Sequence, residues 1–499
     1  MLKQSNPQTK SQSKPTRIRV IGAGLAGPEA AWQCARRGLE VTLHEMRPLR
    51  RTPAHETDLF GELVCSNSLK SDSENTAPWL LKQEMRRAGS LLMDVAARSS
   101  VPAGHALAVD RAQFSQFVTD AIAAEPLIRV ERGEVTSLAG FDGITIIATG
   151  PLTSDALAAE IQRLGGSERL FFFDSISPIV EADSIDHSKV YRAARYGKGT
   201  ADYINCPMTR EEYEAFLAAL ASAQSADSHE WDRVPYFEGC LPIEETARRG
   251  PETLRFGPMK PVGLRNPMTG QIPYAVVQLR QENLRADSYN LVGFQNHLKF
   301  GEQARILRMI PGLENARFLR YGQIHRNTYI NAPAMLTPTL QMKQQPNILF
   351  AGQLCGVEGY VESIATGLLA GVAASAIATG AGAPFKPSSG LSGDVDSGVD
   401  FAAKTAGAPY LPSFGRCGNE QPIPAPRASA HGSLVHYICN ADAKNFQPAN
   451  ITFDLLEQLD EATKRKVRDK KLRHKMVCDR ALEAFDSWLQ QTAELLSTR

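Results

Sequence analysis

The chain has 499 residues, of which 43% are hydrophobic, and its formal net charge is +1. This length allows two or three domains, and the near-neutral charge excludes nucleic-acid binding through overall charge, so such a partner would need a local basic patch. No apolar run is long enough to span a bilayer, and residues 1–15 are polar without the apolar core of a signal peptide. We therefore expect a cytoplasmic protein with a disordered tail over residues 1–15.

The eight cysteines are scattered along the chain without CxxC or paired zinc-ligand spacing. This pattern argues against a metal site and against a disulfide framework. We expect mostly reduced thiols and no bound metal.

Residues 17–45, RIRVIGAGLAGPEAAWQCARRGLEVTLHE, are predicted to form a strand, a glycine-rich turn, a helix and a second strand. A GxGxxG pattern alone can be a turn without a ligand, but here it has the flanking elements and the later acidic residue that dinucleotide binding requires. The glycines would allow a tight turn, close approach of a pyrophosphate and packing of the helix on the strand. The Glu45 carboxylate could accept both hydroxyls of an adenosine ribose. The predicted cofactor-binding residues in this stretch are Gly22, Ala23, Gly24, Leu25, Ala26, Gly27 and Glu45.

Residues 46–72 show no sustained helical or strand period and are expected to form a long loop that crosses the bound cofactor. The loop contains Cys65, which is followed by hydroxyl and amide side chains and by Lys70. A lone cysteine is most often a small buried residue, whereas polar neighbours and a lysine favour a thiolate. The spacing alone leaves both possibilities open.

Three further elements are expected before residue 150. Residues 77–98 have helical periodicity, Asp110 can cap a helix that begins at Arg111, and residues 144–148 form an apolar strand that ends in Thr149-Gly150. A strand with this ending is similar to the one that returns the chain to the cofactor in flavoproteins with two dinucleotide domains. It could also be any buried parallel strand.

The pattern changes from about residue 175. Aromatic and β-branched stretches, with a helical piece at 210–222, predict an inserted α+β domain of roughly 120 to 150 residues. Within it, Cys240 stands between a glycine and an X-Pro turn, and charged residues follow closely. Such a rigid polar turn suits an exposed thiol. Lys260 and Arg265 flank a loop that could meet an anionic ligand or could be solvated surface.

Residues 348–380 are predicted to form a strand, a glycine-rich turn with Gly352, Gly356 and Gly359, and a helix that begins near Tyr360. Backbone N–H groups at the start of that helix would face a flavin ring or its pyrophosphate. No second complete dinucleotide motif is present in the sequence, so we do not expect a separate nicotinamide domain.

Residues 384–430 are rich in Pro, Gly and Ser and are expected to be a linker. Beyond them lies a basic run, 464–475, in which eight of twelve residues are Lys or Arg, followed by a helix. A charge run is usually a solvated helix face, and contact with RNA phosphates is the alternative. The candidate RNA-binding residues are Lys464, Arg465, Lys466, Arg468, Lys470, Lys471 and Arg473.

Together these motifs resemble the bacterial folate- and FAD-dependent tRNA (uracil-5)-methyltransferases. The resemblance rests on IGAGLAGPEAAWQ, TPAHETDLFGELVCSNSLKSD, YFEGCLPIEETARRG, FAGQLCGVEGYVESIATG and NFQPANITF, which occur in order along almost the whole chain. The related flavoprotein family that modifies the tRNA wobble uridine has a longer chain and a different C-terminal domain. Departures from the family pattern are the polar N-terminal tail, Pro28 where a serine is typical, and the 384–430 excursion.

The resemblance implies an α/β fold with a Rossmann-like FAD-binding domain of the glutathione-reductase type, an inserted α+β domain and a C-terminal helical segment. We place the FAD-binding domain at 16–175 and 316–383 and the inserted substrate domain at 176–315. The linker then covers 384–430, and the basic helical segment covers 431–499.

The resemblance also implies methylation of uridine 54 at C5 in the T-loop of tRNA. The carbon would come from 5,10-methylenetetrahydrofolate, and FADH2 regenerated by NADH or NADPH would reduce it. The expected partner is tRNA, with no membrane and no protein partner required.

A thiolate added at C6 of uracil makes C5 nucleophilic, which explains why such an enzyme needs a reactive cysteine. The two cysteines of the family correspond to Cys65 and Cys240, and we favour Cys240 as the nucleophile. Two alternatives remain open: a redox flavoprotein that uses the cysteines as a dithiol, and a tRNA-binding flavoprotein without catalysis.

Overall fold

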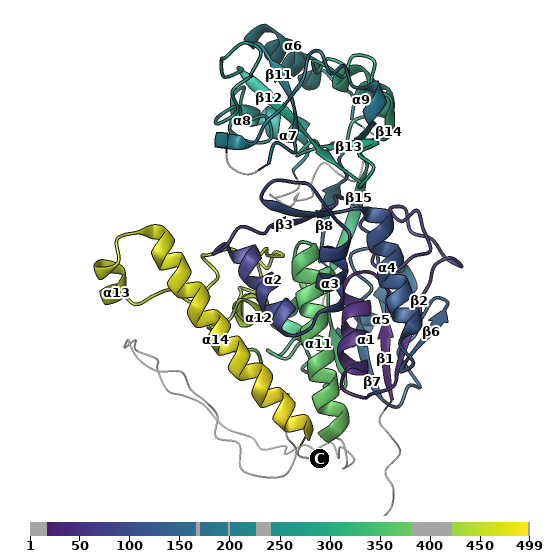
Figure 1. Ribbon diagram of the computed structural model, residues 1–499. Coiled ribbons are helices and arrows are strands. Elements are labelled where there is room, and N and C mark those ends of the chain that lie inside the picture. Colours follow the sequence, from purple (N-terminus) through teal and green to yellow (C-terminus); the bar gives the residue numbers. More distant parts are fainter. Residues whose placement is uncertain (1–16, 166–169, 198–199, 226–240, 381–421, 498–499) are drawn as a thin grey trace, which may run out of the picture.

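The computed structural model describes residues 17–165, 170–197, 200–225, 241–380 and 422–497 (Figure 1). The predicted tail over residues 1–15, Cys240 and most of the predicted 384–430 linker lie outside these residues.

The first sheet has five parallel strands in the order β16-β7-β1-β2-β6. The strands are β1 (Ile18–Ile21), β2 (Val41–Glu45), β6 (Ile128–Arg132), β7 (Ile144–Ile147) and β16 (Ile348–Phe350). Every residue of β1, β7 and β16 is buried, as expected for parallel strands covered on both faces. With β1 next to β2 and the chain crossing over to β7, this is a Rossmann-like sheet.

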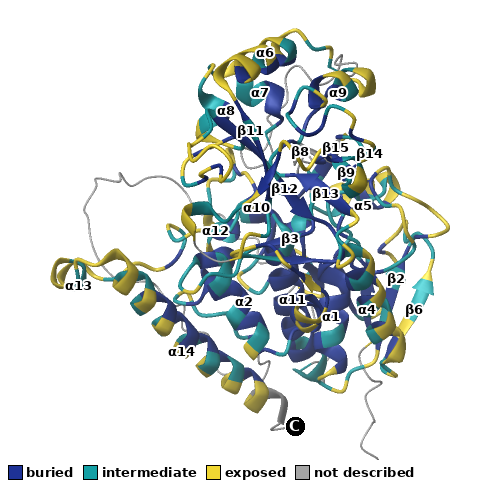
Figure 2. Cartoon of the chain, turned by 45° about the horizontal axis from the view of Figure 1, so that its top comes forward, coloured by how far each residue is buried: buried dark blue, intermediate teal, exposed yellow. Residues whose placement is uncertain are grey.

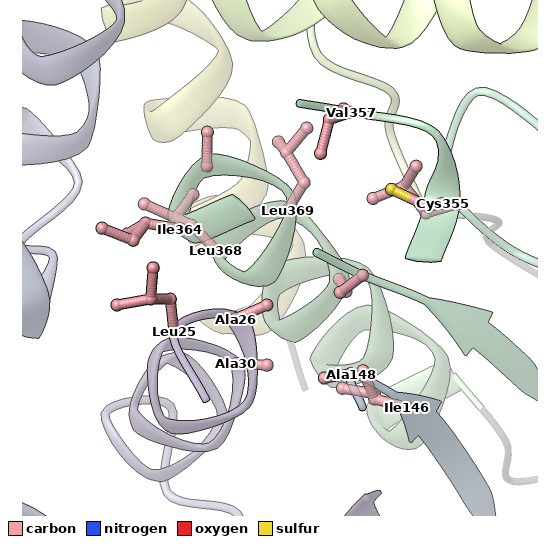
Figure 3. Packing of buried hydrophobic residues seen from close by; sticks show 14 of the residues in the cluster. Leu25, Ala26, Ala30, Ile146, Ala148, Cys355, Val357, Ile364, Leu368 and Leu369 are labelled. Carbon is pink, nitrogen blue, oxygen red and sulfur yellow. The ribbon is translucent and has the colours of Figure 1, made fainter. Parts of the chain in front are cut away.

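Helix α1 (Ala26–Ala35) packs against the long helix α11 (Tyr360–Gly380) through small residues (Figure 3). A Cβ atom on Gly367 would lie 2.3 Å from the carbonyl oxygen of Ala26, and one on Gly371 would lie 2.6 Å from that of Ala30. The two helix backbones are therefore in direct contact, and only glycine fits at these two positions of α11.

Among the described residues, α11 is the one helix that is long and apolar enough to cross a membrane by length and composition. However, 89% of its most apolar stretch is buried inside the protein. Figure 2 shows α11 and α1 in the buried interior, so α11 is a core helix of the fold.

The other helices around the first sheet are α2 (Ala77–Arg87), α3 (Leu91–Arg98), α4 (Arg111–Ala124) and α5 (Asp155–Gly165). The expected cap of α4 is confirmed, because the Asp110 carboxylate accepts from the backbone N–H of Gln113 at 3.1 Å. The prediction of one helix over 77–98 was wrong. Gly89, at φ +68°, ends α2, and the Ser90 hydroxyl accepts from Met93 N–H to start α3.

The prediction that 46–72 is entirely loop was also wrong at its end. There β3 (Ser68–Ser71) pairs with β5 (Ala106–Val109), which also pairs with β4 (Ser100–Val101). Residues 68–71 have no alternating apolar pattern that would predict a strand. The strand forms because it pairs with β5, which is distant in the sequence.

The second sheet has six strands in the order β10-β11-β12-β13-β9-β14 with antiparallel pairing. Its strands are β9 (Ile179–Glu181), β10 (Tyr191–Arg192), β11 (Ile204–Met208), β12 (Ala275–Gln281), β13 (Ser288–Leu291) and β14 (Phe318–Arg320). Helices α6 (Arg210–Ala221), α7 (Ile243–Arg248), α8 (Thr253–Phe256) and α9 (Phe300–Leu307) accompany it. It has a hydrophobic core distinct from that of the first sheet. The ribbon of β8 (Leu170–Ser175) and β15 (Ile324–Tyr329) runs between the two sheets (Figure 1).

After the short helix α10 (Ala332–Met335) and the strand β16, the chain ends in α12 (Ala430–Asn440), α13 (Glu461–Lys466) and α14 (Lys470–Ser497). The carboxylate of Glu84 in α2 accepts from the backbone N–H groups of Ala430 and His431 at 2.7 and 3.0 Å, so it caps α12. The helix after the basic run starts earlier than its apolar pattern predicted. It begins at Lys470, within the run.

We predict that Gly367→Ala destabilises the protein by about 1–3 kcal/mol, because the added methyl group overpacks the α1–α11 contact. The matched control is Gly301→Ala in α9, where an added Cβ meets no atom within 4 Å, and it should leave the stability within about 0.5 kcal/mol of wild type. Urea unfolding of both variants measures the difference. Equal stability of the two variants would contradict the packing argument.

Candidate active site

The first glycine turn has two glycines that packing requires and one that faces open space. A Cβ on Gly22, at φ +100°, would lie 2.6 Å from the Ala148 carbonyl oxygen, and one on Gly27 would lie 1.7 Å from that of Gly22. No atom lies within 4 Å of a Cβ built on Gly24. The turn is thus closed against the protein and open at Gly24, which fits the approach of a pyrophosphate.

A cavity lies at the carboxyl ends of β1 and β2, next to this turn. It is lined by Gly22, Ala23 and Gly24, by the end of β2 including Glu45, and by parts of 133–135 and 149–157. Ligands of parallel α/β sheets bind outside the carboxyl ends of the strands. These residues therefore fit the adenosine end of a dinucleotide.

Glu45 is buried in the lining of this cavity and is held by several donors. Its Oε2 accepts from Ala23 N–H at 2.9 Å, and its Oε1 accepts from the backbone N–H and the Nε of Arg47, each at 3.0 Å. Burial alone would raise the pKa of Glu45, but the Arg47 guanidinium and these backbone donors outweigh it and lower the pKa. The carboxylate is therefore ionised at neutral pH. Sequence reasoning did not identify Arg47.

The second glycine turn surrounds the short 3₁₀ turn Gln353–Cys355 and has three glycines with positive φ. A Cβ on Gly352 would lie 3.1 Å from the Ala26 Cβ, one on Gly356 would lie 2.4 Å from the ring of Phe446, and one on Gly359 would lie 2.5 Å from Glu362 Oε2. Gly352 thus brings this turn next to the first turn of α1. Gly356 and Gly359 fit closely against other parts of the protein.

The loop around Cys65 is held by a tyrosine and an arginine from distant segments. The backbone N–H groups of Cys65 and Ser66 donate to the Tyr360 hydroxyl at 2.7 and 3.1 Å. Arg111 donates to the carbonyl oxygens of Leu63 and Cys65 at 2.8 and 3.4 Å. Burial raises the pKa of Tyr360, so its phenol is neutral at physiological pH.

The same loop is attached to the second sheet. The Asn67 side chain is fully buried and donates to the Val109 and Gln281 carbonyl oxygens at 3.1 and 2.8 Å. Arg280 of β12 donates to Asn67 Oδ1 at 2.9 Å and to the Ser66 hydroxyl at 2.8 Å. Cys65 therefore lies at the junction of the two sheets.

The sequence suggested that Lys70 could favour a thiolate at Cys65, but the Lys70 ammonium group binds other side chains. Its Nζ donates to Glu362 Oε1 at 2.5 Å and to Asn450 Oδ1 at 2.6 Å. The cation that contacts the Cys65 backbone is Arg111, which also forms an ion pair with Glu282 at 2.5 Å. Arg111 has no local sequence signal, since it is 46 positions from Cys65.

Cys240 lies outside the described residues, but the segment that follows it contains an unusual carboxyl group. Glu244 in α7 is buried and accepts from the backbone N–H of His297 at 2.6 Å. Burial raises its pKa to about 7, and within the described part of the chain its Oε2 has no hydrogen-bond partner. The sequence showed Glu244 near Cys240 but not its burial.

The predicted loop cations, Lys260 and Arg265, and the basic run 464–475 are all distant in sequence from the two glycine turns. The loop cations and the basic run lie in different surroundings. Lys260 and Arg265 are exposed. The basic run is divided between α13 and α14. No group of three or more potential metal ligands occurs within the described ranges.

Comparisons with known proteins agree with this geometry. The model of the family "Glucose inhibited division protein A" matches residues 17–381. The methylenetetrahydrofolate–tRNA-(uracil-5-)-methyltransferase TrmFO of Koribacter versatilis is 66% identical over 473 residues, which cover 95% of this chain and 98% of the relative. Its counterpart in Solibacter usitatus is 59% identical over 481 residues, covering 95% and 99%.

Among solved structures, that of Aquifex aeolicus GidA in its form II crystal has a TM-score of 0.64 at 14% identity and covers 97% of this chain and 76% of that chain. This likeness supports the Rossmann-like fold. Given the identity to the curated relatives over nearly their whole length, the chain belongs to the methylenetetrahydrofolate–tRNA-(uracil-5-)-methyltransferase family, within the wider glucose-inhibited division protein A family.

Proposed function

We propose that this protein methylates C5 of a uridine in tRNA, with 5,10-methylenetetrahydrofolate as carbon donor and FAD as bound flavin. The observation that carries the proposal is the Cys65 loop, which is fixed at the junction of a dinucleotide-binding fold and a second sheet. The identity of 66% over 95% of the chain to a relative named for this activity supports it.

We further propose that the target is uridine 54 of the T-loop and that NADH or NADPH supplies the electrons. A methylene group is one hydride short of a methyl group, so the reaction needs a two-electron donor. Bound FAD, once reduced, supplies that hydride.

We infer the following division of labour within the chain. The first sheet with its helices, predicted at 16–175 and 316–383, binds FAD, and the second sheet with its helices, predicted at 176–315, forms the inserted substrate domain. The end of that domain moves from 315 to Arg320, because β14 pairs with β9 of the second sheet. Gly22, Ala23, Gly24, Leu25, Ala26 and Gly27 hold the pyrophosphate, Glu45 the ribose, and Gly352, Gly356 and Gly359 shape the second side of the flavin site. The segment 384–430 links this part to the basic segment 431–499.

The thiol chemistry is assigned to Cys240 and Cys65. A Cys240 thiolate forms a bond to C6 of uracil, which gives C5 the electron density to attack the one-carbon unit. The bond from that carbon to the folate nitrogen breaks, tetrahydrofolate leaves, and a hydride completes the methyl group. Loss of the C5 proton to a base then expels the Cys240 thiolate and restores the C5–C6 double bond. Tyr360 and Arg111 hold the backbone of Cys65, so the second thiol has a fixed position before the tRNA binds.

The direct test is nucleoside mass spectrometry of an unmodified tRNA transcript incubated with the protein, methylenetetrahydrofolate and NADPH. We expect 5-methyluridine with the folate donor and none when S-adenosylmethionine replaces it. Fragment analysis of the T-arm locates the modified uridine. If no product forms while NADPH still reduces the flavin, the protein is a redox flavoprotein and the proposal is wrong.

We predict that Cys65→Ala and Cys240→Ala each lower methyl transfer roughly a thousandfold or more while the protein keeps its flavin. The control is Cys439→Ala, because burial raises the pKa of that thiol to about 12 and it donates to the Thr337 carbonyl oxygen. Rates come from single-turnover methylation and flavin content from absorbance. Full activity of either predicted active-site variant removes that cysteine from the mechanism.

We predict that Glu45→Ala raises the Kd for FAD about tenfold to a hundredfold, since a charge-assisted hydrogen bond contributes roughly 1.5–3 kcal/mol. Glu131→Ala, at the equivalent end of the neighbouring strand β6, removes a carboxylate whose side chain is 40% exposed and should leave the Kd unchanged. Titration of the apoprotein with FAD measures both values. Equal affinities would overturn the ribose contact.

A further inference from the structure

A polar cavity of about 360 Å³ lies between the loop 453–459, α13 and the first turns of α14. Three cations from both helices line it: Lys464, Lys470 and Arg473. Its volume is within the range of small-ligand sites. It is separate from the glycine turns, since none of its lining residues lines the cavity beside Glu45.

The lining has an excess of positive charge. Asp454 is the carboxylate of the lining, and Lys464 also donates to Glu461 at 2.9 Å, whereas Lys470 and Arg473 form no ion pair with any residue that the structure describes. Burial together with the charges of Lys470 and Arg473 lowers the pKa of His474, so the imidazole is neutral at pH 7. The His474 side chain also hydrogen-bonds to the backbone of Asn75, so it is part of the wall of the cavity.

Cations gather at the start of α14. Lys470, Lys471 and Arg473 lie in its first turns, and Asp469 caps the helix, since its carboxylate accepts from the backbone N–H of Lys471 at 2.8 Å. The positive end of the helix macrodipole attracts anions. One cap carboxylate does not offset three cations, so the charge at this end favours an anion in the cavity.

The wall of the cavity is held in place by ring stacking and by contacts to the Cys65 region. The ring of Phe453 stacks on His474 with centroids 3.8 Å apart and an interplanar angle of 18°. Just before Phe453 in the chain, Ile451 N–H donates to Glu362 Oε1 at 2.9 Å, and Asn450 Oδ1 accepts from Lys70. The cavity is thus connected through 450–453 to the strand that follows Cys65.

We propose that this cavity is a subsite for backbone phosphates of the tRNA, which Lys464, Lys470 and Arg473 bind directly. The inference rests on the proposed function and makes it more specific. Of the predicted RNA-binding residues, Arg465, Lys466, Arg468 and Lys471 do not line the cavity. They contribute only to the general positive field.

The experiment compares two triple variants of the full-length, flavin-loaded protein with equal changes in charge. The cavity variant is Lys464→Gln, Lys470→Gln and Arg473→Gln. The matched control is Lys466→Gln, Arg468→Gln and Lys471→Gln, all at exposed positions outside the lining. The Kd for unmodified tRNA is measured from 50 to 300 mM salt, and flavin reduction by NADPH is measured without tRNA.

We expect the cavity variant to raise the Kd roughly tenfold or more and to lower the slope of log K against log salt by about 2–3, because about three phosphate contacts are lost. The control should raise the Kd less than about threefold. Flavin content and NADPH oxidation should match wild type in both variants.

Equal weakening by the two variants would overturn the subsite and leave the proposed function intact. Slower flavin reduction with unchanged tRNA affinity in the cavity variant would also overturn it, because the phosphate bound there would then belong to the dinucleotide. Absence of tRNA binding by the wild-type protein would overturn both the subsite and the proposed function.

Discussion

The contact between α1 and α11 is the constraint on which the rest of the structure depends. Gly367 and Gly371 allow the backbones of these helices to touch at Ala26 and Ala30. Because α1 begins at the first glycine turn and α11 begins at Tyr360, one helix pair fixes the predicted pyrophosphate cradle and the hydroxyl group that holds the Cys65 loop. A shift between these helices would therefore disturb the cofactor site and the thiol together.

The junction between the two sheets is polar rather than apolar. Asn67 and Arg280 are buried there, and Arg280 donates to the Asn67 side chain and to the Ser66 hydroxyl. Asn67 in turn donates to backbone carbonyl groups, and Arg111 pairs with Glu282. Buried ion pairs contribute little net stability because both charges lose their hydration, but they specify geometry. The junction thus sets the position of Cys65 more than it stabilises the fold.

Much of the local architecture could be predicted from the sequence, because it depends on neighbouring residues. The first strand, turn and helix follow from the glycine spacing, the start of α4 from Asp110, and the start of α11 from the glycine turn before it. The contacts that build the candidate site could not be predicted in this way. Tyr360 is 295 positions from Cys65, and Arg280 is 213 positions from Asn67, so no periodicity connects them.

The buried guanidinium of Arg47 joins Glu45 to the loop that follows it in the chain. Arg47 donates to the Thr57 carbonyl oxygen at 3.2 Å and to Glu62 at 3.0 Å, and its side chain is only 2% exposed. Opening of this loop would leave Glu45 and Glu62, two carboxylates, without their shared cation, so it requires local unfolding rather than a simple hinge motion. A dinucleotide enclosed beneath this loop would consequently exchange with solution slowly and behave as a resident prosthetic group rather than as a dissociable cosubstrate.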